Sequence, residues 1–467
     1  MDTIYKDIGP AKGGRSKRVW LQGQILRKNG WDIQTTYERE FDPQTNTISL
    51  IMSQSGKRVV SGKKDSPVID IVNQNVVELS KLSDKVEISI DNQRITICLH
   101  HQDVLREQRE QNFKMASEQR NLTMGTFCVG GGMATLGLHE GFAAAGYNVH
   151  SDWAVDRSES YLDSAMRNNP AFTTKTKVIA AALEELKRDD LSAVNVAQFS
   201  LPCTLHSKAR KRAEGLEMAE NHPTDTTAIY GLLKQFESIN AAVYISENVV
   251  EAQNSASYVI IRETLKLLGY NIYQVTLDNQ QSGSFEQRPR YWFIAVSKGL
   301  AFDTEQSVPT FAKQYQSFGE LMDDVPFDDE QWRDHEYLKA KAIRDKEAGK
   351  GFKRQLITAQ STSLGVINRL YHKRQSTPPY VTRPEDDKER LLTVAEQARA
   401  KSCDPALVKG ESFTNATEIL GQGVDMNQAR GIGLFVARAV CNQNRAVTPI
   451  LRPVMKPNKQ LSLFTAA

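Results

Sequence analysis

One cysteine of this 467-residue chain lies in a setting that suits a nucleophile. Cys203 follows Pro202 at the end of an apolar run, and the residues after it are basic. Neighbouring cations favour the thiolate form of a cysteine, and they can also hold phosphate groups. A packing role for the thiol and a solvated helix face for the cations are the alternatives. The polar and basic side chains of this segment are Ser207, Lys208, Arg210, Lys211 and Arg212.

A carboxylate and two arginines stand beside predicted strands further along the chain. Glu247 follows the apolar residues 243–245, and α/β enzymes place working groups where such strands end. Arg288 and Arg290 precede the apolar run 291–296, and their alternate spacing in an extended segment points both side chains the same way. The alternatives are a helix N-terminal acid favoured by the helix dipole, and surface salt bridges.

A glycine-rich segment predicts a turn between a strand and a helix. Glycines in such a turn let the backbone approach a ligand closely. Asp156 ends the next predicted strand, where an acidic residue can hold ribose hydroxyls. A tight turn without a ligand is the alternative. The segment contains Phe127, Gly130, Gly131 and Gly132.

These groups need a scaffold, and the spacing of apolar segments predicts one. From residue 122 to about 300, short apolar runs alternate with helical patterns, which indicates an α/β domain with a parallel, doubly wound sheet. Residues 301–390 lose that rhythm and carry runs of charge, which predicts a smaller, irregular domain. Helical patterns return near residue 392 and over residues 429–441.

The first hundred residues predict a β-rich module. Apolar and polar residues alternate over 86–90 and 95–99 with a turn between them, which is a hairpin pattern. Residues 101–120 are polar and helix-forming, so we expect a linker helix there. Further strands are predicted at residues 19–26, 47–52 and 68–72.

Taken in order, these segments resemble the DNA (cytosine-5) methyltransferases of bacterial and phage type. The glycine-rich turn, the acidic residue, Pro-Cys, Glu-Asn-Val and Arg-x-Arg follow one another as in that family. Residues 392–399 resemble its Leu-Thr-x-x-Glu-x-Ala-Arg element, and residues 420–424 its closing Gly-Asn-x-Val element, with Gln422 in place of Asn. Glu286 stands where the family has Gln. The resemblance covers about residues 120–452.

The resemblance implies a Rossmann-like, doubly wound methyltransferase domain that binds S-adenosyl-L-methionine and methylates C5 of cytosine in double-stranded DNA. The target base must leave the stack, because C5 is inaccessible in a duplex. Cys203 would attack C6, and Glu247 would bind N3 and the exocyclic amine. Arg288 would hold the O2 side, and Arg290 would support Glu247 or the DNA backbone. The implied cofactor residues are Phe127, Gly130, Gly131, Gly132, Asp156, Pro202, Gly421, Gln422 and Val424.

DNA contacts are expected from two places. One is the basic segment after Cys203, and the other is Lys373 with Arg374, for which a solvated loop is the alternative. A DNA-binding homologue without catalysis and an RNA cytosine-5 methyltransferase are the competing interpretations. The expected domains are a β-rich module with linker helix (1–118), the catalytic core (119–300), a target-recognition domain (301–390), a return to the core (391–452) and a tail (453–467).

Two segments lie outside the resemblance. The N-terminal module weakly resembles the small β-hairpin DNA-binding domains of bacterial transition-state regulators, and auxiliary DNA binding, dimerisation and structural support are all open. The tail matches the bacterial sliding-clamp-binding pentapeptide in its residue types. A glutamine and two apolar anchors can dock into a preformed pocket. Packing of these side chains on the protein's own core is the alternative. The matching residues are Gln460, Leu461, Leu463 and Phe464.

Composition limits the remaining classes of function. The formal net charge is +3, which neither requires nor excludes nucleic acid. The five cysteines lack Cys-x-x-Cys spacing, which argues against a zinc knuckle and a disulfide framework. We find no apolar run of about 18 residues and no apolar stretch at the start, so we expect neither a membrane span nor a secretory signal. The expectation is a cytoplasmic protein without a metal site.

Overall fold

Two compact units, residues 1–108 and 109–467, make up the chain. The computed structural model describes residues 1–202, 223–349 and 354–444. Helix α3 (His101–Gln119) spans the division between the units and lies where the polar, helix-forming sequence predicts a helix. Among the helices within the described ranges, none is both long and apolar enough to cross a membrane.

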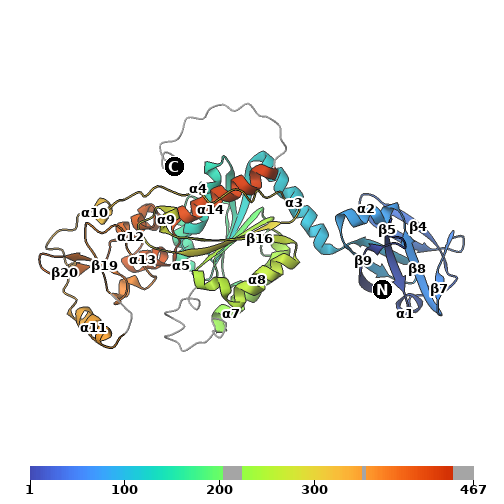
Figure 1. The fold of residues 1–467 in the computed structure, drawn as a ribbon, viewed down its shortest axis with the longest axis horizontal. Helices are drawn as coiled ribbons and strands as arrows, with labels where there is room; N and C mark the ends of the chain where they lie inside the picture. Colours follow the sequence, from blue (N-terminus) through green and yellow to red (C-terminus); the bar gives the residue numbers. More distant parts are fainter. Residues whose placement is uncertain (203–222, 350–353, 445–467) are drawn as a thin grey trace, which may run out of the picture. The chain divides into compact units, whose positions relative to one another are not determined.

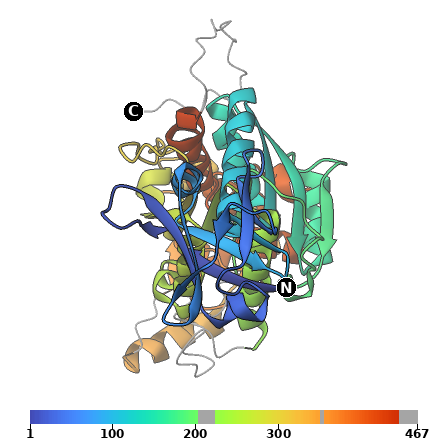
Figure 2. The same cartoon turned by 90° about the vertical axis from the view of Figure 1, so that its right-hand side faces the viewer.

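The N-terminal unit has two antiparallel sheets around one apolar core, seen from two directions in Figure 1 and Figure 2. The six-stranded sheet has the order β1-β9-β10-β5-β4-β6, and the four-stranded sheet the order β2-β3-β8-β7. The elements are β1 (Asp2–Asp7), β2 (Gly9–Pro10), β3 (Lys17–Gln22), α1 (Gln24–Lys28), β4 (Thr36–Asp42), β5 (Thr47–Met52), β6 (Arg58–Val59), β7 (Ser61–Lys63), β8 (Ser66–Val72), α2 (Gln74–Leu82), β9 (Lys85–Ile90) and β10 (Arg94–Leu99).

Alternation of buried and exposed side chains accounts for most of these strands. Val86, Ile88 and Ile90 of β9 are fully buried and separated by partly exposed polar residues, as the sequence predicts. The predicted strand over residues 19–26 is wrong in its last part, because β3 ends at Gln22 and α1 follows. Gly23 lies between them with φ of 105°, a conformation that glycine adopts readily and that interrupts the strand.

The second unit contains a seven-stranded sheet of order β13-β12-β11-β14-β15-β17-β16. β11 to β15 pair in parallel, as the sequence predicts, and β17 departs from that pattern because it is antiparallel to both of its neighbours. The connection from β16 to β17 carries only the four-residue helix α9, and the chain turns back instead of crossing a face of the sheet. Residues that precede β17 therefore lie at the same edge as the carboxyl ends of the parallel strands.

Helices cover both faces of this sheet (Figure 1). α4 and α14 belong to the core on one face, and α7 and α8 to the core on the other. The elements are β11 (Asn121–Phe127), α4 (Met133–Ala144), β12 (Asn148–Asp156), α5 (Glu159–Asn168), β13 (Lys177–Ala180), β14 (Val196–Phe199), α7 (Pro223–Ile239), β15 (Val243–Asn248), α8 (Ala256–Leu267), β16 (Tyr270–Leu277), α9 (Asn279–Ser282), β17 (Arg290–Ser297) and α14 (Met426–Val436).

The 301–390 segment has a small core of its own around a three-stranded sheet, β18-β19-β20. Two further helices, α12 and α13, lead the chain from this segment back to the seven-stranded sheet. The remaining elements are α10 (Phe318–Leu321), α11 (Glu336–Glu347), β18 (Gln355–Ile357), β19 (Pro379–Arg383), β20 (Lys388–Arg390), α12 (Val394–Ala400) and α13 (Phe413–Gln422).

Candidate active site

The glycine-rich turn joins β11 to α4, and its backbone adopts conformations that side chains disfavour. Gly130 and Gly132 have φ of 53° and 73°, in the left-handed region. At Gly131 an added Cβ would lie 2.3 Å from the side chain of Ile419, so the backbone is also closely packed. Asp156, at the end of β12, closes the turn, because its Oδ2 accepts a 2.7 Å hydrogen bond from the Gly130 N–H. The turn is thus held by a carboxylate and is too closely packed to accept a Cβ at Gly131.

Residues from α13 and the following loop lie beside this turn. The Nε2 of Gln422 is buried and has no hydrogen-bond partner among the described residues. It lies 3.3 Å from where a Cβ on Gly130 would stand. Val424, two residues after Gln422, is also buried. The ring of Phe127 packs into the core, with its centre 4.7 Å from the centre of the Trp153 ring. A carboxylate and an unpartnered amide beside a glycine turn fit a nucleoside-bearing cofactor.

A buried acid stands at the same edge of the sheet. β15 is longer than the sequence predicts and includes Glu247, whose side chain is 8% exposed. Arg290, the first residue of β17, places its Nε 2.8 Å from Glu247 Oε1. Burial raises the pKa of Glu247 above its ordinary value, although Arg290 and Arg288 oppose the change. This carboxyl group is therefore suited to hold or share a proton.

Arg288 is fixed from several directions. Its Nη2 donates to the carbonyl of Gly421 at 3.0 Å, and its Nη1 contacts Glu286 Oε1 at 3.3 Å. Its own carbonyl accepts a 2.9 Å hydrogen bond from the side chain of Gln428. Arg288 Nε is buried and has no hydrogen-bond partner among the described residues. A ligand oxygen is one group that would satisfy this nitrogen.

Glu286, which contacts Arg288, also forms a buried ion pair with Lys401 from a distant part of the chain. Lys401 and Glu286 are both 0% exposed, and Lys401 Nζ donates to Glu286 Oε2. Burial, and then the charge of Arg288, lower the pKa of Lys401 to about 7. Burial alone would raise the pKa of Glu286, but Lys401 and Arg288 lower it below its ordinary value. Glu286 is unusual in the sequence because the family has Gln at this place, but nothing in the sequence indicates that Lys401 is buried.

Asn248 is a second residue whose position the sequence does not reveal. Its side-chain amide donates to the carbonyl of Leu201 at 2.9 Å and to the hydroxyl of Tyr258 at 2.8 Å. Leu201 precedes Pro202 and Cys203, so Asn248 fixes the start of the segment that leads to the predicted nucleophile. The only signal is its place directly after Glu247 in the Glu-Asn-Val motif.

The structure brings some predicted residues together and leaves others apart. Glu247, Arg288 and Arg290 share the carboxyl edge of the sheet with Gly421. Lys373 is exposed in a short 3-10 helix of the 301–390 segment, and Arg374 contacts His335 there at 3.0 Å. The remaining predicted residues lie outside the described ranges: Cys203, Ser207, Lys208, Arg210, Lys211, Arg212, Gln460, Leu461, Leu463 and Phe464.

Comparison with known proteins identifies the family of the chain. The family described as C-5 cytosine-specific DNA methylase matches residues 132–434, well over half of the chain. The chain belongs to this family. Among curated relatives, the type II methyltransferase M.MspI of Moraxella sp is 27% identical to this chain over 202 residues. That alignment covers 42% of this chain and 44% of the relative, so the chain spans less than half the length of that protein.

Solved structures support the fold of the methylase. The Dnmt2 methyltransferase of S. pombe has a TM-score of 0.51 and 16% sequence identity, over 68% of this chain and 98% of that one. The Entamoeba histolytica methyltransferase EhMeth has a TM-score of 0.52 and 15% identity, over 68% and 98% of the two chains. At these identities the likeness concerns the fold, and it confirms the predicted Rossmann-like α/β class.

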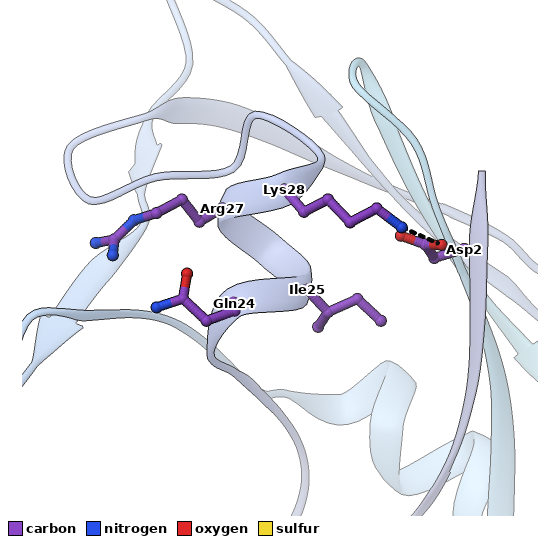
Figure 3. Close-up of a pocket in the computed structure, with 5 residues that line it drawn as sticks. All are labelled: Asp2, Gln24, Ile25, Arg27 and Lys28. Carbon is purple, nitrogen blue, oxygen red and sulfur yellow. Dashed lines mark hydrogen bonds and ion pairs between the residues drawn. The ribbon is translucent and has the colours of Figure 1, made fainter.

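Other features of the methylase do not compete with this site. A hollow in the N-terminal unit lies beside α1, but its charges are already paired: Lys28 Nζ lies 3.0 Å from Asp2 Oδ1 (Figure 3). Within the described part of the chain, no three His, Cys, Asp or Glu side chains are grouped as metal ligands. The hollow is lined by Asp2, Gln24, Ile25, Arg27 and Lys28.

Proposed function

We propose that this methylase transfers the methyl group of S-adenosyl-L-methionine to C5 of cytosine in double-stranded DNA. The observation that carries the proposal is the buried Glu247–Arg290 pair at the sheet edge. A cytosine ring is a poor electrophile at C6 until charge on N3 is neutralised, and a buried acid with a raised pKa supplies that neutralisation. Membership of the family and the name of its type II relative support the same reaction at a particular DNA sequence.

Residues of this chain are proposed to activate the base and to hold it during the reaction. The Cys203 thiolate adds to C6 of the flipped base, and the electrons of the C5–C6 double bond move toward the ring carbonyl and N3. Glu247 donates a hydrogen bond or proton at N3, and Arg288 holds the O2 side. C5 becomes nucleophilic and takes the methyl group, a base removes the C5 proton, and the thiolate leaves. The products are 5-methylcytosine and S-adenosylhomocysteine.

The glycine-rich turn is proposed to hold the cofactor. Bound S-adenosyl-L-methionine supplies an electrophilic methyl group. Asp156 retains lone pairs for ribose hydroxyls, and Gln422 offers its unpartnered amide beside Gly130. Arg290 has a supporting role, because it fixes the orientation of Glu247 toward the base. Pro202, Val424 and the backbone of Phe127 remain predicted contacts.

The test is base-resolution cytosine-methylation sequencing of DNA from a methylation-free bacterial host that expresses the protein. Methylation in one sequence context, absent with Cys203→Ala and Glu247→Gln, is the expected result. A parallel assay with purified protein compares duplex DNA with transfer RNA. Methylation of the RNA alone, or of neither substrate by folded protein that binds the cofactor, would overturn the proposal.

We also propose that residues 460–464 bind the bacterial sliding clamp. The support is the sequence match of Gln460, Leu461, Leu463 and Phe464 to the clamp-binding pentapeptide. Binding to the clamp would raise the local concentration of the enzyme on newly made DNA. Deletion of residues 460–467 is expected to abolish co-elution with the clamp while turnover on short duplexes stays unchanged; co-elution of the deleted form would reject the idea.

A further inference from the structure

Two stretches of the N-terminal unit carry cations without acids. Residues 8–31 contain lysine and arginine but no aspartate or glutamate, and the same holds for residues 43–64. These stretches supply β2, β3 and β7, three of the four strands in the β2-β3-β8-β7 sheet. Positive charge therefore gathers on this sheet although the whole chain is nearly neutral.

The outer surface of the sheet combines these cations with one aromatic ring. Val19 and Leu21 of β3 are fully buried, which places Arg18 and Trp20 on the opposite, outer side. The guanidinium carbon of Arg18 lies 4.2 Å from the centre of the Trp20 ring, and Lys63 Nζ lies 5.6 Å from it. Cation–π attraction thus holds two long side chains in place before any ligand arrives.

Further cations continue this surface beyond both ends of the strands. Lys12 and Arg15 are exposed in the connection from β2 to β3, and Lys64 is exposed in the turn from β7 to β8. Arg18 pairs with Val72 and Lys63 with Ser66, at opposite ends of β8, and both side chains reach toward Trp20. Lys12 and Arg15 lie beyond the Val72 end and Lys64 beyond the Ser66 end, so the strands beneath these cations span about 20 Å at about 3.3 Å per residue. We call this surface the basic face: Lys12, Arg15, Arg18, Trp20, Lys63 and Lys64.

The acids near the basic face do not cancel its charge. Asp70 of β8 lies 3.2 Å from Arg18, and Asp65 follows Lys64 in the turn. Two acids thus stand against five cations, four of which are exposed at its ends. Duplex DNA carries about one negative charge per 1.7 Å of its axis, so a cationic strip of this length faces several phosphates at once.

We propose that the basic face binds the phosphate backbone of duplex DNA without reading its sequence. The choice of DNA rests on the proposed function, because the catalytic unit of the same chain acts on a duplex. Such a contact gives the enzyme a second hold on its substrate. Phosphate contacts position a protein on DNA, whereas base contacts select the sequence, so the basic face contributes affinity and not specificity.

The test compares two variants of the full-length chain in which four exposed cations become glutamine. The first replaces Lys12, Arg15, Lys63 and Lys64. The control makes the same change in net charge on the six-stranded sheet and α2, at Lys6, Lys81, Lys85 and Arg94. Affinity for a 30-base-pair duplex without the enzyme's target is measured by fluorescence anisotropy across a salt series, in the Cys203→Ala background and without cofactor.

Loss of four phosphate contacts is expected to lower the slope of log affinity against log salt by about 3 to 4. At moderate salt the affinity should fall at least tenfold, and the control variant should lose less than threefold. Equal affinities for the wild type and the basic-face variant, or equal losses in both variants, would overturn the proposal. Loss of affinity for duplex RNA with DNA binding intact would assign the face to RNA instead.

The design separates this proposal from that for catalysis. Anisotropy in the Cys203→Ala background does not depend on methyl transfer. If the wild type proves inactive while this assay shows salt-dependent DNA binding through the basic face, only the catalytic proposal is refuted. An active wild type whose variant keeps full affinity refutes only the basic face. Two half variants, Lys12 with Arg15 and Lys63 with Lys64, serve if the fourfold variant unfolds at a lower temperature than the wild type.

Discussion

Replacement of Lys401 by methionine should change how the stability of the catalytic unit depends on pH. Lys401 is fully buried beside Glu286 and Arg288, and its pKa is lowered to about 7 in the folded chain. In the unfolded chain its pKa returns to about 10.4. Between these values the unfolded chain binds more protons than the folded one, so Lys401 makes stability rise with pH. Below pH 7 the lysine is charged in both states and adds no slope.

The size of the effect follows from the width of this window. One pKa unit corresponds to about 1.4 kcal/mol, so an increase from pH 7 to pH 9.5 should relieve about 3 kcal/mol of the cost of burying Lys401. Methionine keeps most of the volume and removes the charge. In the variant, Glu286 still contacts Arg288 Nη1 at 3.3 Å and accepts a hydrogen bond from the Ile367 N–H at 2.7 Å. The loss of Lys401 as its third partner changes the free energy of unfolding by an amount that does not depend on pH. The stability advantage of the variant over the wild type should therefore shrink by about 3 kcal/mol as pH rises.

The assay must report the catalytic unit and not the N-terminal unit. Urea denaturation at pH 7 to 9.5, followed by a brief hydrogen-exchange pulse at one fixed pH, gives this when peptides from β17 are read by mass spectrometry. Lys298→Met is the control, because Lys298 is exposed directly after β17, and it should shift the curve equally at each pH. A difference between Lys401→Met and wild type that stays constant with pH, or that grows, would refute the reasoning.

Three further outcomes are expected. Glu247→Gln should lower kcat at least about a hundredfold, in single-turnover assays, while cofactor binding stays unchanged. Asp156→Ala removes the acceptor of the Gly130 N–H and should weaken cofactor binding at least tenfold by titration calorimetry, with a stability loss of about 1 to 2 kcal/mol. Gly141→Ala would place a Cβ 2.2 Å from the carbonyl of Arg430 on α14 and should destabilise the unit by about 3 kcal/mol in urea.

Local patterns predicted the parts of the structure that local physics determines. Alternation fixed β9 and β10, since one face of each strand is buried at every second residue. The glycines at 130 and 132 indicated a turn between a strand and a helix, and Asp156 ends the strand from which it holds that turn. Gly23, by contrast, sits in an apolar run whose pattern continues past it, so the end of β3 could not be read from alternation alone.

Residues that depend on distant partners escaped prediction. A lysine in Ala-Lys-Ser is ordinary on a surface, and its burial becomes visible only when Glu286, 115 residues earlier, lies beside it. The direction of β17 is hidden for a similar reason, because an apolar run reads the same in either orientation. The predicted strand ended at residue 245, whereas β15 continues to Asn248 and so includes Glu247, which contacts Arg290.

One carboxylate links the candidate site to the segment predicted to recognise DNA. Glu286 Oε1 accepts from Arg288 Nη1 and from the backbone N–H of Ile367, which lies in the 301–390 segment. The backbone of Glu286 bonds to Ala400 O at 2.9 Å, and the next residue bonds to Leu364 O at 2.8 Å. Arg288 Nη1 also donates directly to the carbonyl of Ile367 at 3.4 Å, so the 301–390 segment contacts Arg288 both directly and through Glu286. These contacts form a direct physical connection between the segment predicted to recognise DNA and the arginine proposed to hold the flipped base.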